Sequence, residues 1–512
     1  MTSFSEQQPA TDFNTFLTSF KERLQHLLHV RSDIDQLSVK RGVPPFILRD
    51  ILAAQPLSTF IPQQYGGRGG HIHEGLRLLS AASYESLPLS LGFGINWALF
   101  LQPVAKYAQE AIKQPIFDGF IHQQKMGGLM ITEPDYGSDA LHMQTHYQQQ
   151  GDHFHLQGLK HWAGLTGWAD YWLLTARRKN ESGQLGRDVD FFICDSSAEH
   201  QTIIVEEYFE NLGIYLLPYG RNRIDVKIPK LQKLEPHSTG IKMMLDLLHR
   251  SRMQFPGMAL GFLQRLEDEA VAHCQQRQVG GKNLSSYDQV QQRLSALQAN
   301  VTITAAMCLN SSKKAATTND LSGAGLEANA VKTFVTDMMQ ESAQSLLQLV
   351  GAKGYRLDHI AGRALVDSRP FQIFEGSNDI LYIQIAEAIQ KLMQRRKESN
   401  LLAFISSFEL TSRAADYLKD RLNIDLTLPL SQRRLNAFGQ LISRIIALQL
   451  VEELGDSGYN RVLIANAREH LIQRIAAELS SFVALVSSTY HETNADHNNW
   501  LDCFYRQEKR DR

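Results

Sequence analysis

One carboxylate in this sequence has surroundings that suit acid–base chemistry. Glu375 follows Phe374, precedes Gly376 and stands where a helical pattern begins. A carboxylate with apolar neighbours loses hydration, so its pKa rises and it becomes a useful base near neutral pH. Gly376 has no side chain and lets a planar group approach the backbone. We therefore take Glu375 as the candidate catalytic base; the alternative is a charge that only favours the start of a helix.

Hydrophobic periodicity predicts helices through roughly the first 125 residues. Apolar positions there recur at three- and four-residue spacing, and the expected helices include 45–54, 72–86 and 104–122. From about 126 to 235 the apolar runs become short and are separated by Gly, Asp, Asn and Pro. That pattern predicts a small antiparallel β domain, a sandwich or a barrel.

Helical periodicity returns after the β-rich segment and continues to the end of the chain. Long helices are expected at 243–276, 287–313, 325–350 and 379–396, and such a set predicts a bundle. The predicted fold class is therefore α+β, mostly α. We divide it into an N-terminal helical domain (1–125), a β domain (126–236), a C-terminal four-helix bundle (237–396) and an additional helical region (397–512).

Composition and charge restrict the class of protein. Of 512 residues, 43% are hydrophobic and 21% are charged, which is ordinary for a soluble globular chain with several domains. A net charge of −2 gives no reason to expect nucleic acid. We find no apolar run of the ~18 residues that a membrane span needs and no signal sequence. The four cysteines lack metal-ligand spacing, so no metal is expected, and a cytoplasmic enzyme is the default.

Short motifs follow one another in a fixed order from about residue 20 to 395. They include Tyr65-Gly66-Gly67, Thr132-Glu133-Pro134, Gly137-Ser138-Asp139, Lys160-His161-Trp162, Gly281-Lys282, Gly354-Tyr355 and Glu375-Gly376-Ser377. Each motif is weak alone, but this many in order resembles the acyl-CoA dehydrogenase family. The resemblance implies an FAD-dependent oxidoreductase that acts on an acyl thioester.

The resemblance also implies where FAD would bind. The residues it assigns to the cofactor are Met130, Thr132, Gly137, Ser138, Trp162, Gly164, Arg277, Gln348, Gly351, Ser377 and Asp379. Arg277 and Gln348 would reach the cofactor of a neighbouring subunit, which implies a homodimer or a tetramer. Simpler alternatives are a turn with self-satisfied hydroxyls for Thr132 and Ser138, a core position for Trp162 and a helix cap for Gly351.

In the implied reaction, Glu375 takes a proton from the α carbon while the flavin takes a hydride from the β carbon, giving a trans-2-enoyl thioester. The backbone N–H of Glu375 would polarise the thioester carbonyl. Substrate contacts are expected from Ser138, His249, Arg252 and Gly376; the alternative for Arg252 is an exposed surface arginine. Coenzyme A and acyl carrier protein are both possible carriers, and an electron-transfer flavoprotein is the expected acceptor.

Several positions depart from the family pattern and keep rival functions open. Gly164 stands where the family has a threonine beside the flavin, so its backbone N–H or the nearby Thr166 would have to substitute. Gly280 replaces a phenylalanine and Asp288 a glutamine near the adenine end. The rivals are a degenerate, non-catalytic family member and a flavin oxidase or monooxygenase on the same fold.

About 115 residues follow the segment that resembles the family. Some long-chain members carry such a helical extension, which packs where a second dimer would otherwise sit. Amphipathic helices are expected at 435–454 and 462–486, and the first of them could instead lie on a membrane. The acidic residues Glu452, Glu453 and Asp456 argue against an anionic lipid surface, so we do not expect membrane association.

Overall fold

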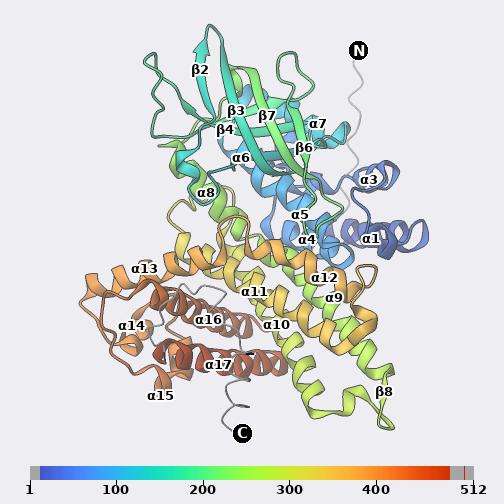
Figure 1. Cartoon of the computed structure of the whole chain (residues 1–512), viewed down its shortest axis with the longest axis vertical. Helices are drawn as coiled ribbons and strands as arrows, with labels where there is room; N and C mark the ends of the chain where they lie inside the picture. The colour runs from blue at the N-terminus through green and yellow to red at the C-terminus, as the bar shows by residue number, and fades with distance from the viewer. Residues whose placement is uncertain (1–11, 485–500, 502–512) are drawn as a thin grey trace.

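The structure, a computed structural model, describes residues 12–484 and 501. A curled β-sheet forms one end of the molecule, the N-terminal helices lie beside it, and long helices form the other end (Figure 1). The order of a helical domain, a β domain and a helical bundle confirms the predicted fold class.

The N-terminal region consists of helices around one apolar core. The main helices are α1 (Phe13–Gln25), α3 (Pro45–Leu52), α4 (Ile72–Glu85), α5 (Leu87–Asn96), α6 (Gln102–Tyr107) and α7 (Glu110–His122). The helix expected at 104–122 is two helices, because the backbone at Ala108 is extended. The continuous helical stretch Leu87–Tyr107 has a mean hydropathy of 1.2, so our expectation that no run is long and apolar enough to span a membrane was wrong. That stretch is 89% buried inside the protein, as a core helix is.

The β domain holds seven strands in one sheet. They are β1 (Gly127–Met130), β2 (His146–Gln150), β3 (His153–Gly164), β4 (Tyr171–Arg178), β5 (Asp190–Asp195), β6 (Ile204–Tyr208) and β7 (Tyr219–Pro229). The order is β1-β4-β2-β3-β7-β6, with β5 also paired to β4. Because β4 runs parallel to β1 and β2, the sheet is mixed and not wholly antiparallel as predicted.

The C-terminal bundle follows the sheet. Its helices are α8 (Gly240–Arg252), α9 (Phe255–Gln276), α10 (Asp288–Lys314), α11 (Gly325–Val350), α12 (Ile360–Ser368) and α13 (Asn378–Arg396). The helix expected at 243–276 is broken after Arg252, because Pro256 cannot donate a helical hydrogen bond and occupies the first turn of a new helix. The break matters because it leaves the end of α8 beside Glu375.

The region after residue 396 packs against this bundle. It contains α14 (Leu401–Ser407), α15 (Lys419–Leu422), α16 (Gln432–Asp456) and α17 (Arg461–Val483), which lie below α13 in Figure 1. We call residues 397–484 the C-terminal extension. A Cβ atom at Gly439 would lie 2.0 Å from the carbonyl oxygen of Tyr382, so α16 and α13 touch backbone to backbone. The apolar residues of α16 are buried, so protein covers the face that the membrane alternative required.

Candidate active site

A cavity of about 270 Å³ lies where the N-terminal helices, the sheet and the bundle meet. Its walls come from α5, the loop after β1, the end of β3, α8, α13 and residues 374–376. More than half of the lining side chains are apolar; they are Leu91, Ile95, Leu99, Leu129, Ile131, Ala140, Trp162, Leu248, Phe374, Ile380 and Leu381. Such an enclosed, mainly apolar pocket with few polar groups is typical of a small-molecule site.

Glu375 lines this cavity and is the carboxylate predicted to do the chemistry. Its Oε1 accepts a hydrogen bond of 2.7 Å from the hydroxyl of Ser251, and its Oε2 is shielded from solvent without a partner. Burial raises the pKa of Glu375, and the hydrogen bond from Ser251 and the charges of Arg252 and Lys332 lower it only in part. One oxygen is therefore fixed and the other is left to accept a proton.

Two buried cations hold the backbone carbonyls of Glu375 and Gly376. The Nε and Nη2 of Arg252 donate to the Glu375 carbonyl at 3.0 and 2.8 Å, and its Nη1 donates to Asn329 Oδ1 at 2.7 Å. The Nζ of Lys332 donates to the Gly376 carbonyl at 2.8 Å. Glu375 and Gly376 have φ angles of 56° and 92°, a left-handed conformation that costs energy for a glutamate. The cations therefore stabilise a strained loop that aims the carboxylate.

Burial shifts the titration of these cations. It lowers the pKa of Lys332 to about 7, although the negative charge of Glu375 raises it in part. Burial likewise lowers the pKa of Arg252, but from so high an ordinary value that the guanidinium stays charged. Arg252 lines the cavity and contacts the backbone of Glu375, and the surface alternative is wrong because only 7% of Arg252 is exposed.

Five of the expected cofactor contacts surround the same cavity. Thr132, Gly137, Ser138, Trp162 and Gly164 all line it. Trp162 has a left-handed φ of 56° beside a bulge in β3, and 54% of its surface is exposed. An indole exposed to this extent is not the buried core residue of the simpler alternative, and its ring remains open to a partner.

Other expected contacts are not at the cavity. The Met130 side chain is buried on the opposite side of β1 from Leu129 and Ile131, since successive strand residues alternate. Thr166 cannot substitute for the missing threonine, because its hydroxyl is buried between the Ala163 carbonyl and Asn222. At Gly164 a Cβ atom would lie 2.7 Å from Ile95 Cδ1, so the present packing leaves no room for a side chain there.

His249, Ser377 and Asp379 also lie outside the cavity lining. The Nδ1 of His249 hydrogen-bonds the Leu321 carbonyl at 2.7 Å, and burial lowers its pKa to about 4. It is thus a neutral residue of the bundle and not the substrate contact that we expected. Ser377 precedes α13 as its N-cap residue, and Asp379 accepts a hydrogen bond from Asn436 of the C-terminal extension.

Gln348 and Gly351 lie in a separate groove of about 740 Å³ at the end of α11. Leu212, Tyr355 and Arg369 share its lining, and 62% of Leu212 and 84% of Tyr355 are exposed. Arg277 is exposed beyond the end of α9, outside both the cavity and this groove. None of these three expected cofactor residues lines the cavity of Glu375, and their contact with a neighbouring subunit stays a prediction.

Sequence reasoning gave no role to Ser251, Tyr219, Asn329 or Lys332. Tyr219 lines the cavity, and burial and the charge of Glu375 raise its pKa. Asn329 and Lys332 are buried polar residues three apart on α11, so they share the helix face that meets the loop. The available signal was a lysine that is the one charged residue between positions 328 and 336 of an expected helix, because a buried lysine needs specific partners. No cluster of metal-binding side chains is present within the described residues.

Comparisons with known proteins agree with this architecture. Residues 128–225 match the family model of the acyl-CoA dehydrogenase middle domain, and residues 238–390 match that of its C-terminal domain. A glutaryl-CoA dehydrogenase of Desulfococcus multivorans is 26% identical over 333 residues, which cover 64% of this chain and 84% of that protein.

Solved structures share the fold at lower identity. An acyl-CoA dehydrogenase from Bacillus anthracis, complexed with FAD, has a TM-score of 0.73 at 16% identity and covers 95% of this chain and 90% of its own. That coverage includes most of the C-terminal extension. A prolyl acyl carrier protein oxidase has a TM-score of 0.66 at 18% identity and covers 74% of this chain and 98% of its own.

Proposed function

Since this chain belongs to the acyl-CoA dehydrogenase family, we propose that it is an FAD-dependent oxidoreductase that converts an acyl thioester to its trans-2-enoyl product. The observation that carries the proposal is Glu375, whose Oε2 is buried without a partner at the wall of an apolar cavity. An oriented carboxylate with a raised pKa is a competent base. The presence of this carboxylate also argues against the rival hypothesis of a degenerate, non-catalytic family member.

The residues at the cavity fit a flavin. Thr132 and Ser138 supply hydroxyls beside Gly137. A Cβ atom at Gly137 would have no other atom within 4 Å, so the backbone there is open to a ligand. Trp162 packs against Phe209, with ring centroids 4.6 Å apart, yet 54% of its surface stays exposed, which suits a flat ring system with a polar edge. FAD bound there would accept the hydride from the β carbon of the acyl group.

The chain's own residues supply the other half of the reaction. Glu375 Oε2 takes the α proton while Ser251 holds Oε1, so the carboxylate keeps one orientation. Within the described residues the backbone N–H of Glu375 has no partner, and we assign it to the thioester carbonyl, where a hydrogen bond favours the enolate-like transition state. The apolar walls exclude water from the reacting atoms.

The lining also favours an uncharged acyl group. Among the cavity residues that the structure describes, Arg252 and Glu375 carry the formal charges, and three of the five N–H donors of Arg252 already bind the Glu375 carbonyl and Asn329. His161 accepts a hydrogen bond of 2.8 Å from Arg221, and burial lowers its pKa, so it offers no positive charge. A terminal carboxylate on the substrate would therefore have to compete with the Glu375 carbonyl and Asn329 for the one guanidinium at the cavity.

We expect anaerobic reduction of the protein-bound flavin by hexanoyl thioesters, with kcat/KM at least about 100-fold above that for glutaryl thioesters. The monomethyl ester of the glutaryl thioester is the matched control, because it removes the charge at nearly constant shape, and it should recover most of the rate. The coenzyme A and acyl carrier protein forms are compared in parallel. Reduction by no thioester at all would refute the proposed function, and equal rates for the acid and its ester would refute the charge selection.

Electron-transfer flavoprotein is the proposed acceptor, and the proposed assembly is a homodimer in which Gln348, Gly351 and Arg277 complete the cofactor site of the other subunit. The groove at the end of α11 suits that role, because exposed Leu212 and Tyr355 stand beside Gln348. Oxygen uptake matched to product without an added acceptor would instead identify an oxidase.

Substituting Tyr355→Asp should convert the proposed dimer to a monomer and weaken FAD retention, because a carboxylate would be desolvated at the interface. Analytical ultracentrifugation and the flavin content after gel filtration measure both effects. Val462→Asp is the matched control, since Val462 is 76% exposed on α17 and lies outside the groove. A Tyr355→Asp protein with unchanged mass and flavin content would place the interface elsewhere.

A further inference from the structure

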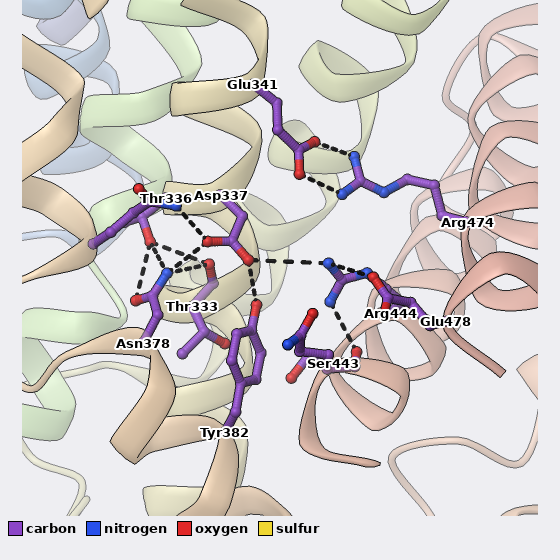
Figure 2. Close-up of polar contacts among 12 residues, drawn as sticks. Thr333, Thr336, Asp337, Glu341, Asn378, Tyr382, Ser443, Arg444, Arg474 and Glu478 are labelled. Atoms are coloured by element: carbon purple, nitrogen blue, oxygen red, sulfur yellow. Dashed lines mark hydrogen bonds and ion pairs between the residues drawn. The ribbon is translucent and has the colours of Figure 1, made fainter. Parts of the chain in front are cut away.

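A continuous series of polar contacts joins the loop after Glu375 to the C-terminal extension (Figure 2). It starts at Lys332, whose Nζ donates to the Gly376 carbonyl at 2.8 Å and to Asn378 Oδ1 at 2.9 Å. The Nδ2 of Asn378 then donates to Asp337 Oδ1 at 2.7 Å. Asn378 is the first residue of α13 and stands three positions after Glu375. This contact therefore fixes the C-terminal end of residues 373–377, which we call the catalytic loop.

Asp337 of α11 is the centre of the series. Its Oδ1 also accepts from Gln372 Nε2 at 2.7 Å, just before the catalytic loop, and its Oδ2 accepts from the Tyr382 hydroxyl at 2.6 Å. One carboxylate therefore holds both ends of the segment that carries Glu375.

The positive charge that faces Asp337 Oδ2 comes from the C-terminal extension. Arg444 of α16 places Nη2 at 4.0 Å from that oxygen and 3.0 Å from Glu478 Oε1 of α17, and its side chain is 3% exposed. Burial lowers the pKa of Arg444, but the nearby Tyr382, Glu478 and Asp337 raise it by more, so the guanidinium is firmly charged. The Asp337 side chain is 15% exposed, so little water is available to compensate Asp337 for the loss of Arg444.

The packing around Arg444 makes its position rigid. Its guanidinium lies 5.0 Å from the centroid of the Phe334 ring on α11. One turn earlier on α16, Gly439 meets the Tyr382 backbone so closely that no Cβ atom would fit. Movement of α16 would therefore move Arg444, Tyr382 and the carboxylate between them together.

We propose that the C-terminal extension positions the catalytic base: Arg444 holds Asp337, and Asp337 holds the two ends of the segment that carries Glu375. Arg444 is a positioning residue that touches neither substrate nor cofactor. The inference depends on the proposed function for its kinetic consequence, but the mechanical coupling stands on the contacts alone. The extension is thus part of the working enzyme and not an accessory to its assembly.

A second ion pair in the same interface provides a matched control. Arg474 of α17 pairs with Glu341 of α11, one turn beyond Asp337, and its guanidinium lies 5.1 Å from the same Phe334 ring (Figure 2). The Glu341 side chain is 47% exposed. Within the described part of the chain, neither Arg474 nor Glu341 forms a hydrogen bond or an ion pair with residues 371–378. Both arginines thus link the C-terminal extension to α11, Arg444 from α16 and Arg474 from α17, but only Arg444 pairs with a residue that is hydrogen-bonded to Gln372 and Asn378.

The experiment compares Arg444→Met with Arg474→Met in the full-length, FAD-loaded protein. We expect Arg444→Met to lower kcat for thioester-dependent flavin reduction about tenfold with KM within about twofold, because a misplaced base slows chemistry more than binding. Hydrogen–deuterium exchange should also accelerate in peptides that cover 371–380. Arg474→Met should change kcat and this exchange by less than about twofold, which a purely structural role for both arginines would not produce.

A second pair of variants keeps the test decisive if Arg444→Met folds poorly. Arg444→Met leaves both Asp337 and Glu478 without this partner. Adding Asp337→Asn removes the less exposed of the two charges, so the double variant should recover part of the melting temperature relative to Arg444→Met while staying slow. Equal effects of Arg444→Met and Arg474→Met on kcat and exchange, or unchanged exchange at 371–380, would overturn the inference. If no thioester reduces the wild-type flavin, the proposed function fails, yet the exchange comparison still decides the coupling.

Discussion

Replacing Glu375 by glutamine should reduce thioester-dependent flavin bleaching by at least about 10³-fold while leaving FAD bound, since a positioned general base contributes about 10² to 10⁴. The amide keeps the shape of the carboxylate and accepts the same hydrogen bond from Ser251, but it cannot accept the α proton. Anaerobic stopped-flow at the flavin band measures the rate, and the absorbance of the purified protein measures the bound cofactor.

The control for this substitution is Glu267→Gln. Burial also raises the pKa of Glu267, but it lies on α9 and is not among the described residues that line the cavity, so its amide should leave the rate within about twofold. Wild-type activity should fall as the pH drops through the raised pKa of Glu375, and this acid limb should start above the usual carboxylate range. Appreciable bleaching in Glu375→Gln would show that another group takes the proton.

The stability effect of the same substitution has the opposite sign. Because the folded-state pKa of Glu375 is raised, the native protein binds a proton more tightly than the unfolded chain, and stability falls as pH rises between the unfolded and folded pKa values. Above the folded pKa the full penalty of the buried charge is present. Glu375→Gln should therefore melt at a temperature equal to or above that of the wild type near pH 7, which separates loss of chemistry from loss of fold.

The candidate catalytic segment could be proposed from the sequence because its signals are local. A glutamate between an aromatic residue and a glycine, and the ordered motifs before it, lie within short windows of the chain. The long helices followed from periodicity, and the expected helix at 325–350 coincides with α11. The predicted helix boundaries were wrong where a single residue determines them. Pro256 is an example, because its missing N–H breaks the expected helix beside the site.

The supports of Glu375 could not be predicted in the same way. Ser251, Lys332 and Arg444 are 124, 43 and 69 positions from Glu375, and only the packing of three helices brings them to one loop. A pattern of apolar and polar residues predicts which helix face is buried, but not which face of another helix it meets. His249 shows the converse error: it lies three residues before Arg252 on α8, yet its ring faces the Leu321 carbonyl and not the cavity.

Substituting Arg252→Met should have the second-largest effect, because it removes the donors that hold the Glu375 carbonyl. Two charge-assisted hydrogen bonds to that oxygen and one to Asn329 are lost together. We expect about 10²-fold slower flavin reduction, since displacing a base by about 1 Å can cost that much, and a loss of about 2–4 kcal/mol in the free energy of unfolding. Stopped-flow and thermal denaturation measure the two effects.

Arg250→Met is the matched control, because Arg250 is as deeply buried on the same helix but donates to carbonyls at Ala315, Ala316 and Asn319. It should lose comparable stability, while its folded fraction keeps a rate within a few fold of the wild type. Arg252→Lys keeps the positive charge but has one donor nitrogen in place of three, so its rate of flavin reduction should lie between those of the wild type and Arg252→Met. If Arg250→Met and Arg252→Met slow flavin reduction equally per folded molecule, then the carbonyl contact of Arg252 does not orient the base, and the left-handed conformation at Glu375 must be held by Lys332 and the packing of α13 alone.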